Sequence, residues 1–375
     1  MTEAEHFLSR SVSIIGTRGY PSYYGGFETA VRRLAPFLTE AGWDVTVYGR
    51  KGSTKEDDPK ANPSVHSKYT RGINSKSLST LTFGATASAS ALVHKPDVAL
   101  VMNVANGFFL PALRARGIPT LVNVDGIEWD RAKWNRAAKA VFHAGATMSA
   151  RWASELVFDA MAIGDRWKRE FGVDGTFIPY GADAHAPLEV EPGLQHRNYV
   201  LYVARFVPEN SVNEFFAAAK VLAARWPVVI VGSDGFQGEF DARAQELDQS
   251  SPSIRWLGHV SDDRRLTSLW QHAGAYFHGH SVGGTNPALV QAMASGAPTV
   301  ARDTVYNRET LGSAGLFSEP DPQSIVTAVS DLLDSSDGDR LSQVARERAR
   351  TEYSWEGVCG AYESTLSRLV DEKRR

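Results

Sequence analysis

The sequence has little cysteine and no apolar run long enough to cross a membrane. Cys359 is the single cysteine among 375 residues, which excludes an internal disulfide framework and suits a reducing compartment. The most apolar later region is interrupted by residues 94–97 (HKPD), well short of the roughly 20 apolar residues that a spanning helix needs. The first residues carry two glutamates where a secretory signal carries positive charge. We therefore expect a soluble, cytoplasmic protein.

The sequence also lacks a large excess of either charge, because its net charge is only −3. That value hides an asymmetry: up to Asp183 there are 22 Lys and Arg against 18 Asp and Glu, and after it 18 against 25. This balance disfavours a uniformly basic face for nucleic acid, and we expect no nucleic-acid partner. Binding of anionic material by the more basic first half remains an alternative.

The sequence lacks two nucleotide-binding motifs and the usual arrangements of metal ligands. Neither G-x-G-x-x-G nor G-x-x-x-x-G-K-[ST] occurs, so the dinucleotide and P-loop interpretations lose their main support. The acidic doublets Asp57–Asp58 and Asp262–Asp263 fall in polar, surface-like segments, not at the ends of apolar strands. His278 and His280 have no third ligand nearby, which disfavours a zinc site. We predict that the protein binds no metal.

Short apolar runs alternate with helical segments along the whole chain. Runs without polar alternation, each followed by a helix, predict a parallel sheet covered on both faces. The runs form two groups, which predicts an α/β protein with two Rossmann-like domains. The first group lies at residues 12–16, 44–49, 97–102 and 120–126, and the second at 199–205, 228–232, 254–258, 275–280 and 298–303.

The segment between the two groups, residues 179–198, has three prolines, two glycines and no helical or strand period, and we interpret it as a hinge. We place the first domain at residues 1–183 and the second at 184–353. A helical tail at residues 354–375 is expected to cross back toward the first domain.

Two loops that follow strands are rich in glycine. Gly16, Gly19, Gly25 and Gly26 lie between the first strand and a helix, where they fit either close approach to a phosphate or ordinary tight turns. The loop at 279–298, GHSVGGTNPALVQAMASGAP, is more informative. Its asparagine is a preferred N-cap residue, and the next residue is a proline, which suits the first helical position.

This second loop therefore predicts that a helix begins at Asn286. The N-terminus of that helix, together with the Gly283–Thr285 backbone, offers N–H groups and a positive dipole end to a phosphate or to sugar hydroxyls. An ordinary capped helix after a buried strand is the alternative.

Charged side chains follow other strands. Arg205 stands between a strand and a helix, where its guanidinium suits a pair of phosphate oxygens. Asp125 and Glu128 follow a strand of the first domain, where a carboxylate would face a cleft. Either acid equally fits a helix cap.

Four blocks, taken in this order, resemble the bacterial rhamnosyltransferase-type branch of family-four retaining glycosyltransferases. The resemblance spans nearly the whole chain, and it rests on IIGTRGYPSYYGGFETAVRRLAPFL, VNVDGIEWDRAKW, YVARFVPENS and GHSVGGTNPALVQAMASGAPTVARDTVYNRE. It implies a GT-B fold, in which two Rossmann-like domains face a cleft, the second holding a nucleotide diphosphate sugar and the first a saccharide acceptor. It also implies L-rhamnose transfer from dTDP-L-rhamnose in the synthesis of cell-surface polysaccharide. No cofactor is implied, because the nucleotide sugar is a substrate.

The resemblance assigns roles residue by residue. It implies that Asp125 lies near the reacting carbon and that Arg205 pairs with the diphosphate. The residues that it implies around the donor are Gly25, Gly26, Arg205, Gly284, Thr285, Asn286 and Gln291. On the acceptor side we expect Arg18, Glu28 and Glu128.

Three positions depart from the broader family. Two glutamates usually stand eight positions apart on the donor loop and its helix, and here these positions are Gly283 and Gln291. Gln291 still offers a hydrogen bond to a ribose hydroxyl, without charge. A lysine usually follows the phosphate arginine, and here Asn210 takes its place, so that Arg18 or Arg308 would have to supply the counter-charge.

Two other functions remain open, since a fold does not by itself determine a reaction. One is a nucleotide-sugar epimerase or hydrolase on the same fold, and the other is a nucleotide-sugar-binding protein without catalysis. Independently of these, residues 131–151 carry five Lys and Arg and no acid, and residues 165–172 add three basic residues around Trp167. We expect this basic surface to attach to an anionic membrane that carries a lipid-linked acceptor. A solvated helix whose tryptophans pack inward is the alternative.

Overall fold

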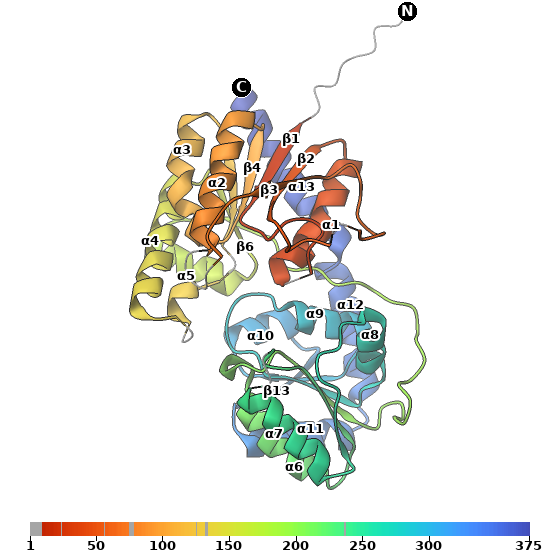
Figure 1. Cartoon of the computed structure of the whole chain (residues 1–375). Coiled ribbons are helices and arrows are strands. Elements are labelled where there is room, and N and C mark those ends of the chain that lie inside the picture. The colour runs from red at the N-terminus through yellow and green to blue at the C-terminus, as the bar shows by residue number, and fades with distance from the viewer. Residues whose placement is uncertain are drawn as a thin grey trace, which may run out of the picture. The chain divides into compact units, whose positions relative to one another are not determined.

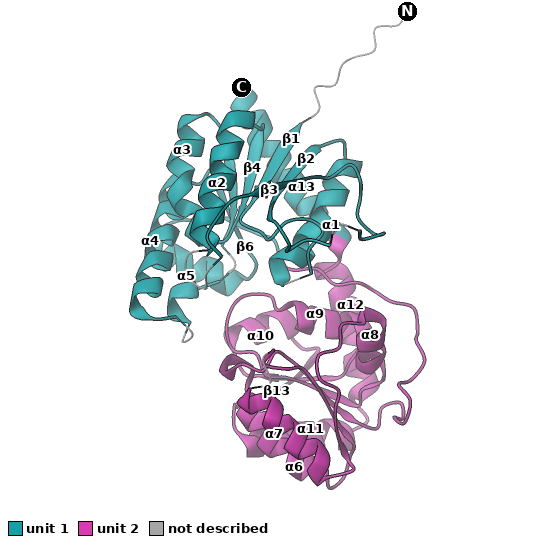
Figure 2. Cartoon of the chain, in the orientation of Figure 1, with its two compact units in different colours: residues 1–179, 356–375 teal, residues 180–355 magenta. Residues whose placement is uncertain are grey.

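The computed structural model describes residues 10–23, 25–55, 57–74, 79–124, 126–131, 134–235 and 238–375. The chain forms two compact units (Figure 2). Unit 1 contains residues 1–179 and 356–375, and unit 2 contains residues 180–355. The boundary between them thus falls at the start of the proline-containing segment 179–198.

Unit 1 is built on a seven-stranded parallel sheet in the order β3-β2-β1-β4-β5-β6-β7 (Figure 1). Its interior is made by strands that carry apolar residues on both faces, such as the fully buried VALVM of β4. The strands are β1 (Ser11–Ile15), β2 (Asp44–Arg50), β3 (His66–Thr70), β4 (Val98–Met102), β5 (Thr120–Asn123), β6 (Glu155–Phe158) and β7 (Thr176–Phe177).

Helices follow most of these strands, whereas residues 51–65 connect β2 to β3 without a described helix. The helices are α1 (Gly26–Glu40), α2 (Ser79–His94), η1 (Val104–Phe109), α3 (Leu110–Ala115), η2 (Glu128–Asp130), α4 (Arg136–Trp152) and α5 (Met161–Phe171), with α13 (Trp355–Arg374) at the end of the chain.

The C-terminal helix α13 packs on unit 1, as the sequence predicts for a tail that crosses back. Its Tyr362 hydroxyl accepts a hydrogen bond from Asn123 Nδ2 at 2.6 Å, at the end of β5. Trp43 Nε1 donates to Glu363 at 3.2 Å, and Arg368 forms an ion pair with Glu155 at 2.9 Å. A buried apolar side of α13 completes the contact.

Unit 2 has a six-stranded parallel sheet in the order β10-β9-β8-β11-β12-β13. Its strands are β8 (Val200–Val203), β9 (Val228–Val231), β10 (Ile254–Trp256), β11 (Ala275–His278), β12 (Thr299–Arg302) and β13 (Gly315–Ser318). The other elements are η3 (Pro208–Asn210), α6 (Val212–Leu222), α7 (Glu239–Ser250), α8 (Asp263–His272), α9 (Pro287–Ser295), α10 (Val305–Leu311), α11 (Pro322–Asp334) and α12 (Gly338–Glu352).

Helices cover both faces of this sheet. Phe277 of β11 belongs to a core cluster with residues of α6, α7 and α11. Its neighbour Tyr276 belongs to a second cluster with residues of α8 and α9. Because successive strand residues point to opposite faces, His278 shares the α8 and α9 face with Tyr276.

The structure confirms the two parallel-sheet, Rossmann-like domains, and all nine predicted strands are present. Among the residues that the structure describes, four further strands were not predicted. β3 (His66–Thr70) is mostly exposed and polar at the edge of its sheet, so it lacks an apolar run. The other three are the short strands β6, β7 and β13, of four, two and four residues. Among the described helices, none is both long and apolar enough to cross a bilayer.

Candidate functional site

The candidate donor site lies at the carboxyl ends of β8 and β11, which are neighbours in the sheet of unit 2. The strand order reverses between them, since β9 and β10 extend to one side and β12 and β13 to the other. In open parallel sheets this reversal leaves a crevice in which ligands bind. Arg205 follows β8, and the loop 279–286 follows β11. Both predicted donor segments therefore border the same crevice.

The loop after β11 ends in the helix start that the sequence predicts. Asn286 is the N-cap of α9, and its Oδ1 accepts a hydrogen bond from the N–H of Ala288 at 2.9 Å. Pro287 takes the first helical position. Gly283 has a φ of 89°, in the left-handed region that favours glycine, and Thr285 is buried. The loop thus delivers the positive end of α9 to the carboxyl edge of the sheet.

Arg205 presents its side chain to solvent while its backbone is held. Its carbonyl oxygen accepts two hydrogen bonds, from Val207 N at 2.9 Å and from Asn210 Nδ2 at 2.7 Å. The residue is exposed, and within the described part of the chain its guanidinium forms no ion pair or hydrogen bond. A cation without a protein partner at this edge suits an anionic ligand.

Several polar residues at this edge were not singled out for this role from the sequence. Asn210 is buried, and its Oδ1 is hydrogen-bonded to Nδ1 of His280 at 2.6 Å. Ser281 donates through its N–H and its hydroxyl to the carbonyl of Glu209, both at 2.9 Å. Asn307 donates to the carbonyl of His280 at 2.8 Å. These bonds connect three segments: η3, the loop after β11, and α10. The segments are far apart in the sequence, so no local sequence pattern predicts the bonds between them.

His278 is a buried, neutral imidazole. Its Nδ1 lies 2.9 Å from the hydroxyl of Tyr276, and its Nε2 has no hydrogen-bond partner among the described residues. Burial, and to a lesser degree the nearby His280, lowers the pKa of His278 to about 3. Because it is uncharged and enclosed, His278 is not a phosphate counter-charge.

Two residues expected to serve the donor are engaged elsewhere. The side-chain amide of Gln291 is hydrogen-bonded to both backbone groups of Asp183. Arg308, offered as a replacement for the lysine, forms a two-bond ion pair with Asp303. That pair holds the pKa of Asp303 below its usual value. Both side chains thus have protein partners, whereas the Arg205 guanidinium has none among the described residues.

In unit 1 the glycine-rich loop lies between β1 and α1. Gly25 is the N-cap of α1 and Gly26 its first residue. Glu28 is buried, and its Oε1 accepts a hydrogen bond from the N–H of Arg18 at 3.0 Å. A Cβ on Gly25 would lie 3.4 Å from Glu28 Oε2, at the edge of ordinary van der Waals contact. Glu28 therefore shapes this loop from within.

Glu128 is buried in a polar contact of its own. Its Oε2 accepts a hydrogen bond from Trp134 Nε1 at 2.7 Å, and its Oε1 pairs with Arg131 at 2.9 Å. Its side chain does not cap a helix, since the N-cap of η2 is Ile127. Asp125, the predicted residue near the reacting carbon, lies outside the described residues.

Trp167, which lies among the basic residues of 165–172, is not part of a surface that could meet a membrane. Trp167 of α5 is fully buried. The centroid of its ring lies 4.8 Å from that of Phe171, 5.8 Å from that of Phe158 and 6.0 Å from that of Trp129. Its charged sequence neighbours lie on other sides of the helix. Trp134 is half-buried and packs against Phe142 at 5.2 Å. The inward packing of tryptophans, the alternative considered above, holds for Trp167.

No group of three or more His, Cys, Asp or Glu in the described part of the chain is arranged to hold a metal ion. Asp262 instead caps α8, accepting hydrogen bonds from Arg264 N and Arg265 N. Asp58 accepts one from the hydroxyl of Tyr23.

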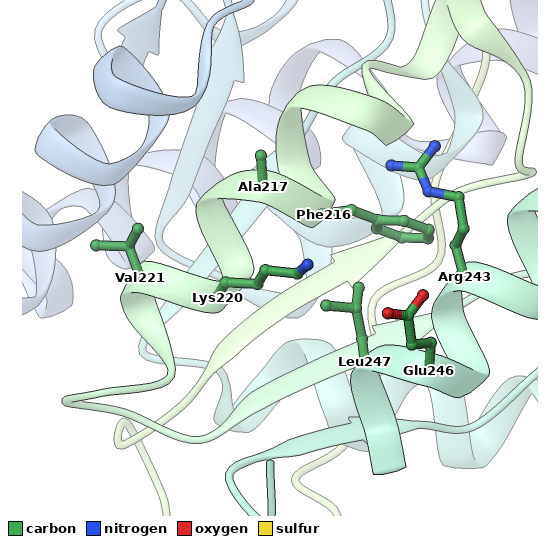
Figure 3. A pocket seen from close by; sticks show the side chains of 7 residues that line it. All are labelled: Phe216, Ala217, Lys220, Val221, Arg243, Glu246 and Leu247. Carbon is green, nitrogen blue, oxygen red and sulfur yellow. The ribbon is translucent and has the colours of Figure 1, made fainter. Parts of the chain in front are cut away.

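A cavity of about 340 Å³ lies along α6 and α7. Figure 3 shows that its lining comes from these two helices, with Lys220, Arg243 and Glu246 beside apolar side chains. None of the strand-end residues described above lines it, so it is separate from the candidate donor site.

In comparisons with known proteins, each half of the chain matches a family model. Residues 24–185 match the family described as Glycosyltransferase Family 4, and residues 189–352 match the family described as Glycosyl transferases group 1. A curated relative, O-antigen chain mannosyltransferase B of Escherichia coli, is 25% identical over 187 residues, which is 48% of this chain and 48% of the relative. The match thus spans about half the length of that protein.

Solved structures share the fold over almost the whole chain. Sucrose-phosphate synthase of Thermosynechococcus elongatus has a TM-score of 0.77 and 18% identity, with 97% of this chain and 100% of that one covered. HepE of Anabaena, in complex with UDP, has a TM-score of 0.71 and 15% identity, with 96% and 99% covered. Each half of the chain therefore matches a glycosyltransferase family model, and the chain has the GT-B fold of glycosyltransferases.

Proposed function

We propose that this chain is a retaining glycosyltransferase that moves a hexose from a nucleotide diphosphate sugar to a saccharide acceptor. The observation that carries the proposal is the pairing of the exposed Arg205 with the capped N-terminus of α9 at neighbouring strand ends of unit 2. A diphosphate suits both groups, since one is a cation and the other the positive end of a helix. We assign donor binding to unit 2 and acceptor binding to unit 1.

The proposed chemistry needs no protein nucleophile. As the bond to the sugar breaks, negative charge grows on the departing diphosphate, where Arg205 and the N–H groups of the 283–286 loop stabilise it. The acceptor hydroxyl attacks the anomeric carbon from the face that the diphosphate leaves. A diphosphate oxygen takes the hydroxyl proton. Asp125 is proposed to lie near the reacting carbon from unit 1.

We propose dTDP-L-rhamnose as the donor, on the sequence resemblance, and polysaccharide as the product class. A nucleotide-linked mannose is the second candidate, because the curated relative is an O-antigen chain mannosyltransferase. The acceptor is proposed to be lipid-linked and to be met at an anionic membrane surface.

The first experiment is a binding screen of UDP, dTDP, GDP and ADP, followed by their sugars, by thermal shift and calorimetry. A ligand that binds only the folded state raises its stability by RT ln(1 + [L]/Kd). We expect one diphosphate to bind and its sugar to be transferred to acceptor, with activity retained in excess EDTA. Binding of no diphosphate would refute the proposal. Release of free or isomerised sugar without acceptor would identify a hydrolase or an epimerase, and binding without turnover a non-catalytic protein.

A further inference from the structure

Asn210 is buried, and both polar ends of its side chain are bonded within unit 2. The residue is 6% exposed. Its Nδ2 donates to the carbonyl of Arg205 at 2.7 Å, and its Oδ1 lies 2.6 Å from Nδ1 of His280. Its backbone is bonded too, because its N–H donates to Val207 and its carbonyl accepts from the Tyr202 hydroxyl at 2.8 Å.

These partners determine the orientation of the amide and the proton on His280. The Arg205 carbonyl only accepts, so the NH₂ group of Asn210 must face it. The oxygen of Asn210 then faces His280, and since it also only accepts, His280 must carry a proton on Nδ1. The Asn210 amide therefore bridges a backbone carbonyl and an imidazole N–H without bearing any charge.

The same two segments are joined by further bonds. Ser281 donates twice to the carbonyl of Glu209, and Ser211 Oγ donates to the carbonyl of Gly279 at 2.9 Å. A Cβ on Gly279 would lie only 2.2 Å from the Asn210 carbonyl oxygen, so the backbones approach closely. The loop that carries Arg205 is thus attached to the end of β11.

We propose that Asn210 is a positioning residue that, with His280, holds the Arg205 loop against the end of β11 and does not itself contact the donor diphosphate. The bond from Asn210 orients the Arg205 peptide while leaving the guanidinium exposed. Holding a ligand-binding group in place before binding reduces the ordering cost of binding. This inference rests on the proposed function, in which Arg205 binds the diphosphate.

The substitution Asn210→Lys separates this role from that of a missing counter-charge. A lysine has three donors and no acceptor, so it leaves the N–H of His280 without its partner and forces a longer, charged side chain into a buried place. If position 210 is merely a phosphate ligand that has lost its charge, the lysine restores the charge and tightens binding. If Asn210 positions Arg205, the lysine weakens binding.

The experiment is calorimetry with the nucleoside diphosphate that binds best to the natural protein. We expect Asn210→Lys to weaken its binding by about tenfold or more, because Arg205 is then no longer held in place before the ligand binds. Asn198→Lys is the matched control, because Asn198 is exposed and precedes β8 at the opposite end of the sheet. It adds the same charge and should leave the affinity unchanged. Equal or tighter binding by Asn210→Lys overturns the inference.

A second measurement does not depend on how any variant folds. The ¹⁵N chemical shifts of the His280 ring in the natural protein report which nitrogen carries the proton. We expect the proton on Nδ1, and a proton on Nε2 alone overturns the inference. If the natural protein binds no nucleoside diphosphate, the proposed function fails, whereas the ring measurement still decides whether Asn210 and His280 are bonded as described.

Discussion

The side chain of Gln291 exchanges two hydrogen bonds with the backbone of Asp183. Nε2 donates to the Asp183 carbonyl at 2.9 Å, and Oε1 accepts from the Asp183 N–H at 3.1 Å. The amide thereby satisfies both the N–H and the carbonyl of Asp183, and it attaches α9 to the first residues of unit 2. The broader family has a glutamate at this position by the resemblance described above, and a glutamate cannot make both bonds.

Gln291→Glu is therefore expected to destabilise unit 2. The carboxylate accepts from the Asp183 N–H but cannot donate, so the Asp183 carbonyl loses its partner and faces a negative oxygen. We expect a loss of about 1–3 kcal/mol in the free energy of unfolding, measured with urea. Gln195→Glu, at an exposed residue, controls for the added charge. An equally stable variant that binds nucleotide more tightly would show that position 291 serves the ribose.

Arg205→Ala is expected to weaken nucleoside diphosphate binding by about 1.5–3 kcal/mol, the range for hydrogen bonds to charged groups. Its stability should hardly change, because the side chain is exposed and its hydrogen-bonded carbonyl belongs to the backbone. Arg308→Ala is the matched control, since Arg308 is exposed and already paired with Asp303. Calorimetry distinguishes the two, and equal losses in both variants would contradict the assignment of the diphosphate to Arg205.

His278 makes a definite contribution to the pH dependence of stability. Its pKa is about 3 in the folded protein, below the value of about 6.5 in an unfolded chain. As the pH falls below about 6.5, the imidazole becomes protonated in the unfolded chain but stays neutral in the folded protein. Stability is therefore lost progressively down to about pH 3. The slope from this group approaches 1.4 kcal/mol per pH unit.

Removing the imidazole should remove this loss. We expect His278→Leu to lose less stability than the natural protein between pH 7 and pH 4.5, by on the order of 2 kcal/mol. Urea unfolding at both pH values measures the difference, in which the other titrating groups cancel. Identical pH dependence in the two proteins would show that His278 is protonated inside the fold.

The sequence predicted what local chemistry determines and missed what distant segments determine. The cap at Asn286 and the proline after it were predictable, because one residue and its successors settle a helix start. The bonds from Asn210 to His280 were not, since the two residues are 70 positions apart and meet only when β8 and β11 are neighbours. Trp167 was misjudged from its charged neighbours. Ile163 and Trp167, one helical turn apart and both fully buried, carry the period that predicts the buried side.

The final prediction concerns the basic surface of unit 1. With Trp167 buried, attachment to a membrane has to come from charge, and Arg136 at the exposed start of α4 and the half-buried Lys139 are two of the basic residues that supply it. Lys133 belongs to the same sequence cluster and lies outside the described residues. Each basic residue near an anionic leaflet contributes about 1 kcal/mol at low salt. We expect the protein to float with phosphatidylserine vesicles at low salt and to be released when salt screens the charges.

The triple variant Lys133→Ala, Arg136→Ala and Lys139→Ala should weaken vesicle binding by about 100-fold, because three such contributions are lost. Its control is the triple alanine variant at Lys51, Lys60 and Lys95, three exposed lysines of the same unit. The control changes the net charge equally and should still float. Equal losses in both would mean that overall charge alone attracts the protein. If the natural protein remains at the bottom of the gradient at low salt, residues 131–151 do not attach unit 1 to an anionic membrane.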